Sequence, residues 1–152
     1  MTIIYRWNFI SVLTLTACLA FGADTTPSLD IPALVKKAES GDALAQFSLG
    51  TRYYNGAGVP KDPVLAVSWY RKAAEQGNAS AQWLLGFNYS LGEGVPKDDV
   101  LAYFWYNLSA AQGHQHATDA RDIISKYMTS AQIAEAQRMT QEWKPTKASA
   151  SP

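Results

Sequence analysis

The chain has 152 residues, with 13 Lys+Arg against 13 Asp+Glu, so its formal net charge at pH 7 is zero. This length favours one domain or one short repeat array. A nucleic-acid-binding domain needs a concentrated basic face to neutralise phosphates, so the balanced, unclustered charge argues against a nucleic-acid partner. The single cysteine, Cys18, excludes an intramolecular disulfide framework and any multi-cysteine zinc site.

Residues 1–22 have the order of a secretory signal peptide. Arg6 precedes a mostly apolar stretch from Trp7 to about Ala20, and small residues follow. The stretch is short for a hydrocarbon core of about 30 Å and contains polar residues, which favours a removable signal over a transmembrane helix. We therefore expect an exported protein, periplasmic or secreted, in which residues 23–30 form a linker.

Two ways of processing this signal remain open. Residues 20–22 (Ala-Phe-Gly) have small side chains at the two positions that a signal peptidase recognises, so cleavage there releases a chain starting at Ala23. Residues 15–18 (Leu-Thr-Ala-Cys) instead resemble a bacterial lipobox, which would make Cys18 the lipidated first residue of an outer-membrane lipoprotein. The apolar run continues past Cys18, which favours ordinary cleavage. A membrane is thus an expected partner only through a lipid anchor at Cys18.

The body of the chain is a tandem repeat with a period of 36 residues. Residues 41–76 and 77–112 are identical at 20 of 36 aligned positions, far more than unrelated segments would share. A third unit, over residues 113–143, departs from the pattern as a capping element does. We expect a repeat domain over residues 31–144 and a disordered tail over residues 145–152, which have no hydrophobic periodicity.

Each unit carries the signals of two helices. In the first unit, Asp42 is placed to cap a helix running to about Tyr54, and Asp62 to cap a second one running to about Glu75. The Gly-x-Gly of residues 56–58 ends the first helix, because glycine accepts the positive φ that this turn needs. The second unit repeats these signals 36 residues later.

Helices are also predicted at both ends of the array. Asp30 precedes a helix through about Glu39. Thr129 and Gln132 have the spacing of a capping box, and the helix that follows presents Ala136 inward.

Helical spacing predicts a core of small and aromatic residues on facing stripes. Glycine inside an exposed helix costs about 1 kcal/mol relative to alanine, so a glycine that recurs in both units implies a packing reason. The predicted core residues are Ala45, Leu49, Gly50, Tyr53, Ala66, Trp69, Tyr70 and Ala73, and their counterparts Ala81, Leu85, Gly86, Tyr89, Ala102, Trp105, Tyr106 and Ser109.

Three motifs together resemble Sel1-like repeats, which are relatives of the tetratricopeptide repeat. They are GxGVPKD between two helices, AQxxLGxxY before it, and WYxxAAxQG-type endings. The resemblance covers roughly residues 31–143 and implies an all-α, right-handed α/α solenoid with two full 36-residue units plus capping helices. It also implies a non-enzymatic adaptor or regulator in the bacterial cell envelope that binds a protein or peptide and needs no cofactor.

No residue set in the sequence indicates catalysis or metal binding. His114 and His116 lack the i, i+4 spacing and third ligand of a helical metal site. The Gly-x-Gly motifs follow a helix, and no GK[ST] follows them, so they do not predict a phosphate-binding loop. One alternative function is an enzyme of the cysteine-rich Sel1-like β-lactamase type, although S-x-x-K, S-D-N and K-T-G are absent. The other alternative is a secreted host-interaction factor.

The first helix of each unit lines the groove in the related tetratricopeptide fold, so its variable positions are expected to contact the partner. These positions are Leu44, Ser48, Thr51, Arg52 and Asn55 in the first unit, and Ser80, Leu84, Phe87, Asn88 and Leu91 in the second. Leu84, Phe87 and Leu91 form an apolar stripe that fits either a groove anchor or the core. Arg52 and Asn88 are expected to supply hydrogen bonds at the rim of the groove.

Overall fold

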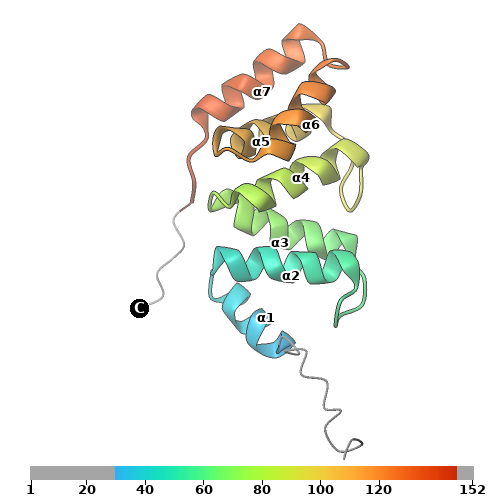
Figure 1. The fold of residues 1–152 in the computed structure, drawn as a ribbon, viewed down its shortest axis with the longest axis vertical. Coiled ribbons are helices and arrows are strands. Elements are labelled where there is room, and N and C mark those ends of the chain that lie inside the picture. The colour runs from blue at the N-terminus through green and yellow to red at the C-terminus, as the bar shows by residue number, and fades with distance from the viewer. Residues whose placement is uncertain (1–29, 147–152) are drawn as a thin grey trace, which may run out of the picture.

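The computed structural model describes residues 30–146. The predicted signal segment 1–22 with Cys18, linker residues 23–29 and tail residues 147–152 lie outside the described residues. Over residues 30–146 the chain forms seven α-helices and no strand, which confirms the predicted all-α fold (Figure 1). The helices are α1 (Ile31–Glu39), α2 (Ala43–Asn55), α3 (Pro63–Glu75), α4 (Ala79–Leu91), α5 (Asp99–Ala111), α6 (Gln115–Ser125) and α7 (Ser130–Glu142).

The helices are stacked in chain order from α1 at one end to α7 at the other (Figure 1). Helices α1 to α6 pack mainly on their neighbours in sequence, with α2 against α3 and α4 against α5 inside the two units, and α3 against α4 between them. At the C-terminal end α5 contacts both α6 and α7. The result is a solenoid of helical repeats in which a hydrophobic core runs along the stack.

The helices begin and end at the predicted capping residues. An Oδ1 atom of Asp42 accepts a hydrogen bond from the Ala45 amide at 2.7 Å, and Asp62 caps α3 in the same way. Both caps recur in the second unit. Gly56 ends α2 with φ of 71°, in the left-handed region that glycine adopts without strain.

The second glycine of each Gly-x-Gly turn also has a positive φ, 79° at Gly58 and 73° at Gly94, which explains why it recurs. Gly94 in addition makes a close approach, because a Cβ atom there would overlap the carbonyl group of Pro63, at the start of α3. The turn of the second unit therefore lies directly against the first unit.

The predicted core is confirmed, apart from Tyr53, which is half-buried. The expected packing reason for the helical glycines is also present. A Cβ atom on Gly50 would lie 2.7 Å from Cδ1 of the buried Tyr70, so α2 and α3 approach too closely for any side chain at that position.

Buried glutamines join consecutive helices through side-chain hydrogen bonds. Gln46 Nε2 donates to the Ala38 carbonyl at 3.0 Å, and its Oε1 accepts from Gln76 Nε2 at 2.7 Å, which ties α1, α2 and α3 together. Gln82 makes both bonds again in the second unit. Because these side chains are buried and satisfied on both ends, they fix the spacing of the stack without an uncompensated polar group.

The C-terminal end differs from the expected tail. The capping box of Thr129 and Gln132 is present and starts α7 as predicted. After α7, however, the chain turns back along the stack (Figure 1), and the Thr146 amide donates to the Glu75 carbonyl at 2.8 Å. Residues 145 and 146 were expected in a disordered tail, but they lie against the α3–α4 turn, where Pro145 Cβ is 3.7 Å from the position that a Cβ on Gly77 would take. The backbone hydrogen bond of Thr146 holds them there.

Candidate functional site

The 36-residue offset relates α2, α4 and α6, the first helices of successive units. Positions three, four and seven residues apart on each of these helices follow the same face. We call this set the first-helix face. It consists of Ser48, Thr51, Arg52 and Asn55 on α2; Leu84, Phe87 and Leu91 on α4; and Ala120, Ile123 and Tyr127 on or directly after α6.

The α2 part of this face is a hollow lined mainly by polar residue types, although carbon atoms make up most of its exposed surface, and we call it the polar hollow. Ser48, Thr51, Arg52 and Asn55, all predicted from the sequence, line one depression of about 410 Å³ together with Phe47 and Ala57. The Thr51 hydroxyl is already engaged, because it donates to the Phe47 carbonyl at 3.0 Å. Among residues 30–146 the Arg52 guanidinium has neither a hydrogen-bond acceptor nor an ion-pair partner. The half-buried arginine is therefore the available donor of this hollow.

Leu44 is well exposed and lies outside the polar hollow. It lines a smaller depression of about 180 Å³ with Ser48, next to Lys37 of α1 and Asp42, the N-cap of α2. Ser48 thus connects the two depressions. Ser80, the counterpart of Leu44, is half-buried on α4.

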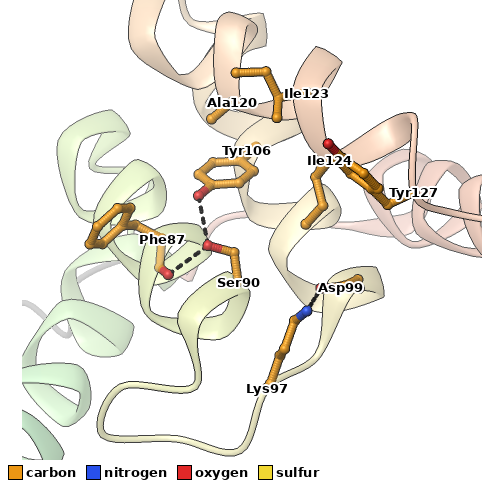
Figure 2. A pocket seen from close by; sticks show the side chains of 9 residues that line it. All are labelled: Phe87, Ser90, Lys97, Asp99, Tyr106, Ala120, Ile123, Ile124 and Tyr127. Atoms are coloured by element: carbon orange, nitrogen blue, oxygen red, sulfur yellow. Dashed lines mark hydrogen bonds and ion pairs between the residues drawn. The ribbon is translucent and has the colours of Figure 1, made fainter.

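A second hollow, of about 340 Å³, opens between α4, α5 and α6 (Figure 2). Phe87 and Ser90 come from α4, Tyr106 from α5, and four apolar or aromatic residues from α6 and the turn after it. Its full lining is Phe87, Ser90, Lys97, Asp99, Tyr106, Ala120, Ile123, Ile124 and Tyr127. The lining is largely apolar, which suits aliphatic or aromatic side chains of a partner.

Charge is neutralised within this apolar hollow. Lys97 Nζ lies 3.5 Å from Asp99 Oδ1, so its two charged residues pair with each other (Figure 2). Tyr106 and Ser90 share a hydrogen bond of 3.3 Å. Burial raises the pKa of Tyr106 above its usual value, and the Ser90 hydrogen bond only partly opposes this, so the hydroxyl is neutral at physiological pH. The apolar hollow thus has no unpaired charge.

The apolar stripe predicted on α4 is divided between the core and the surface. Phe87 is half-buried and packs against the core while it also lines the apolar hollow. Leu84 is half-buried, whereas Leu91 is 59% exposed. Phe87 thus contributes both to the core and to the hollow, while contact of this stripe with a partner stays a prediction.

Asn88 is wrongly predicted as a rim residue. Its side chain is fully buried, and Nδ2 donates to the Leu84 carbonyl of the preceding turn at 2.7 Å. Its counterpart one unit later, Ile124, is also buried. This helix position therefore faces the interior in the last two units, although Arg52, at the same position of the first unit, reaches the surface hollow.

Sequence reasoning missed the α6 part of the face. Ile123 is 57% exposed and Tyr127 is 81% exposed, and both line the apolar hollow. The signal was available, because adding 36 to positions 87 and 91 gives 123 and 127. Sequence identity fades in the third unit, which hid the correspondence.

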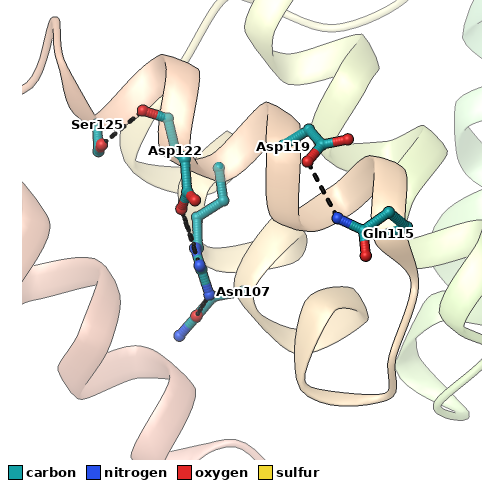
Figure 3. A network of polar contacts seen from close by, with 6 residues as sticks. Asn107, Gln115, Asp119, Asp122 and Ser125 are labelled. Carbon is teal, nitrogen blue, oxygen red and sulfur yellow. Dashed lines mark hydrogen bonds and ion pairs between the residues drawn. The ribbon is translucent and has the colours of Figure 1, made fainter.

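Polar contacts on another side of α6 fix its orientation. Arg121 pairs with Asp122 at 2.8 Å and donates to Asn107 of α5 at 3.4 Å. Asn107 in turn donates to Thr140 of α7 at 3.3 Å. Figure 3 shows Asn107 and Asp122 of this network, together with the separate Gln115–Asp119 hydrogen bond. These contacts tie α6 to α5, and α5 to α7, in an orientation that leaves Ile123 and Tyr127 at the surface.

The two histidines pack on an aromatic ring. His114 precedes α6 and stacks on Trp83, with ring centroids 5.3 Å apart, and His116 lies 5.9 Å from the same ring. Over residues 30–146 no three His, Cys, Asp or Glu side chains are grouped closely enough to hold a metal ion. Within this same range, no helix has both the length and the apolar character needed to cross a membrane.

Comparison with known proteins identifies the repeat. The Sel1 repeat family model matches residues 43–78 and 79–114, with the 36-residue period of the sequence and a start two residues later. The chain is a Sel1-repeat protein. Its repeats are therefore the same structural unit that was inferred from the GxGVPKD and AQxxLGxxY motifs.

Solved structures similar to this Sel1-repeat protein have the same fold. A protective antigen with an SLR fold from uropathogenic Escherichia coli strains superposes with a TM-score of 0.72 and 37% identity over 78% of this chain. A Sel1 repeat protein from Oxalobacter formigenes gives a TM-score of 0.58 and 40% identity over 59% of this chain. In each case the match covers 26% of the solved chain.

A curated relative matches over a shorter stretch. The secretory immunoglobulin A-binding protein EsiB of Escherichia coli O6:H1 strain CFT073 is 43% identical over 44 residues. The match covers 29% of this Sel1-repeat protein and 9% of EsiB. The shared part is thus repeat sequence, a small fraction of the relative's length.

Proposed function

We propose that this Sel1-repeat protein is a non-enzymatic adaptor that binds a protein or peptide through its first-helix face. The observation that carries the proposal is the pair of exposed apolar residues Ile123 and Tyr127, which line the apolar hollow together with Phe87. Apolar side chains gathered at one surface site favour association, because burying them removes apolar area from water. EsiB, the similar protein that is named for binding secretory immunoglobulin A, supports a protein-binding role.

The best test residue is Ile123, because it is exposed and contributes to the hollow. Phe87 is less suitable, since an aspartate there would also disturb the core against which Phe87 packs. Val64 on α3 offers a matched control, because it is a similarly exposed aliphatic residue, 66% accessible, outside the first-helix face. Substitutions at such exposed sites usually change stability by no more than about 0.5 kcal/mol.

The experiment compares wild type, Ile123→Asp and Val64→Asp as baits for proteins of a cell-envelope extract, with mass spectrometry as the readout. We expect Ile123→Asp to lose the proteins that wild type captures above a bait-free resin, and Val64→Asp to retain them. Equal capture by wild type and Ile123→Asp would show that the first-helix face is not the binding surface.

The proposal also places the site of action outside the cytoplasm, either in the bacterial cell envelope or after secretion. The support is the signal pattern of residues 1–22. Replacing Cys18 by Ser and labelling cells with a radioactive fatty acid distinguishes the two processing routes. Label on wild type that disappears from the Cys18→Ser protein supports the lipid anchor, whereas label retained by the mutant, or absent from wild type, rules it out.

A further inference from the structure

The first-helix face changes chemistry along the array. Three positions that repeat every 36 residues are polar on α2 and apolar on α4 and α6. They are Ser48, Thr51 and Asn55 on α2, Leu84, Phe87 and Leu91 on α4, and Ala120, Ile123 and Tyr127 at α6. A partner that covers the whole face must therefore be polar at one end and apolar at the other.

Arg52 gives the polar end a specific charge preference. It is the one titratable residue in the lining of the α2 hollow, and within residues 30–146 no carboxylate pairs with it. Its position in the last turn of α2 is favourable for a cation, but the helix dipole supplies no acceptor for the guanidinium donors. A carboxylate suits these donors best, since its two oxygens can accept two parallel hydrogen bonds from one arginine.

Neighbouring groups of the polar hollow add to this preference. The Ser48 hydroxyl and the Asn55 amide line the same depression and can donate to an anionic oxygen. At the other end, Lys97 and Asp99 pair with each other at 3.5 Å, so the charged residues that line the apolar hollow carry no net charge. An anion is thus favoured at α2 over the hollow between α4, α5 and α6.

We propose that the partner segment is an extended peptide with a carboxylate at one end and aliphatic or aromatic side chains at the other. The carboxylate binds Arg52, and the apolar side chains fill the hollow lined by Phe87, Ile123 and Tyr127. This assignment rests on the proposed function and specifies the chemistry of the ligand. One helix, α3, stands between α2 and α4 in the stack, so the two ends are separated by up to two helix spacings, roughly 20 Å, a span of about six extended residues.

The test uses a randomised dodecapeptide phage library with the full chain as bait. We expect the enriched peptides to carry Asp or Glu several residues away from an aliphatic or aromatic cluster. One enriched peptide is then synthesised with a fluorescent label, and its affinity is measured by anisotropy. Arg52→Gln should weaken binding by about tenfold or more, because a charge-assisted pair is lost.

The matched control is Arg138→Gln, on the exposed surface of α7 and outside both hollows. Its affinity for the peptide should equal that of wild type.

Enrichment of apolar peptides without acidic residues, or equal binding by Arg52→Gln and wild type, overturns the carboxylate assignment. In that case loss of binding in Ile123→Asp still supports the proposed function, so the two failures are distinguishable. No enrichment over a bait-free surface also overturns this inference, and the capture experiment with Ile123→Asp then decides the proposed function by itself.

Discussion

A Cβ atom on Gly86 would lie 2.8 Å from Cδ1 of Tyr106, so the tyrosine ring occupies the space that any side chain at position 86 would need. Gly50 and Tyr70 make the same contact in the first unit. Both tyrosines are buried, and each stands on the second helix of its unit. The glycine–tyrosine contact therefore sets how closely the two helices of a repeat approach.

Replacing Gly86 by Ala should destabilise the protein. Alanine gains up to about 1 kcal/mol in helix propensity, but overpacking a core usually costs about 1–3 kcal/mol. The buried Tyr106 ring would have to shift to make room for the new methyl group, so we expect a net loss of about 1 kcal/mol in the free energy of unfolding. Urea unfolding followed by circular dichroism measures it.

The control for this prediction is a double-mutant cycle with Tyr106→Leu. Leucine removes the ring atoms that the new methyl group would meet, so the alanine should be neutral or stabilising in that background. An equal effect of Gly86→Ala in both backgrounds would show that the Tyr106 ring is not the cause.

The repeat made most of the fold predictable from the sequence. Asp42, Asp62 and Gly56 signal helix ends through local chemistry, and their recurrence 36 residues later confirms each signal independently. The core followed for the same reason, since helical spacing and small residues identify the faces that meet. Helix caps and core spacing are properties of one repeat and its copy, and both copies are present in a single sequence.

The candidate site was less predictable, because exposure depends on what packs against a helix. Asn88 is polar and differs from Arg52 at the same position of the first unit, yet its side chain is buried on α4. Ile123 and Tyr127 are apolar, yet the contacts of Arg121 hold α6 so that they reach the surface. Thr146 is another such case, since its hydrogen bond to Glu75 joins residues that are far apart in sequence. No local pattern contains these long-range relationships.

Trp143 should anchor the C-terminal segment to the α3–α4 turn. Its ring packs against the core and approaches within 4.0 Å of the position that a Cβ on Gly77 would take. Trp143→Ala removes a half-buried indole, so we expect a loss of about 2 kcal/mol, less than the 3–5 kcal/mol of a fully buried tryptophan. Thermal unfolding measures the loss. Amide hydrogen exchange should show faster exchange at Thr146, whose donor bond to Glu75 depends on this docking.

Lys144→Ala is the matched control for the tryptophan variant. Lys144 is the next residue in the same segment and is exposed, so its replacement should leave both the melting temperature and Thr146 exchange close to wild type. A Trp143→Ala protein with wild-type exchange at Thr146 would contradict the anchoring role.

The buried tyrosines predict how stability depends on alkaline pH. Burial raises the pKa of Tyr70 and of Tyr106, and their hydrogen bonds to Thr51 and Ser90 oppose the rise only partly. In the unfolded chain a tyrosine loses its proton near pH 10, while the folded protein still holds it. Below that pH both states are protonated and the contribution to stability is constant. As the pH rises above about 10 towards the higher folded pKa, the unfolded state is favoured and stability falls.

Melting temperatures measured from pH 8 to pH 11 test this prediction, with Tyr106→Phe as the comparison. Phenylalanine keeps the ring against Gly86 but has no ionisable proton, so its melting temperature should fall less steeply above pH 10 than that of wild type. At pH 8 the two proteins should differ by no more than about 1 kcal/mol, since one hydrogen bond to Ser90 is lost. Parallel curves over the whole range would mean that Tyr106 ionises equally in the folded and unfolded states, against the burial of its ring between α4 and α5.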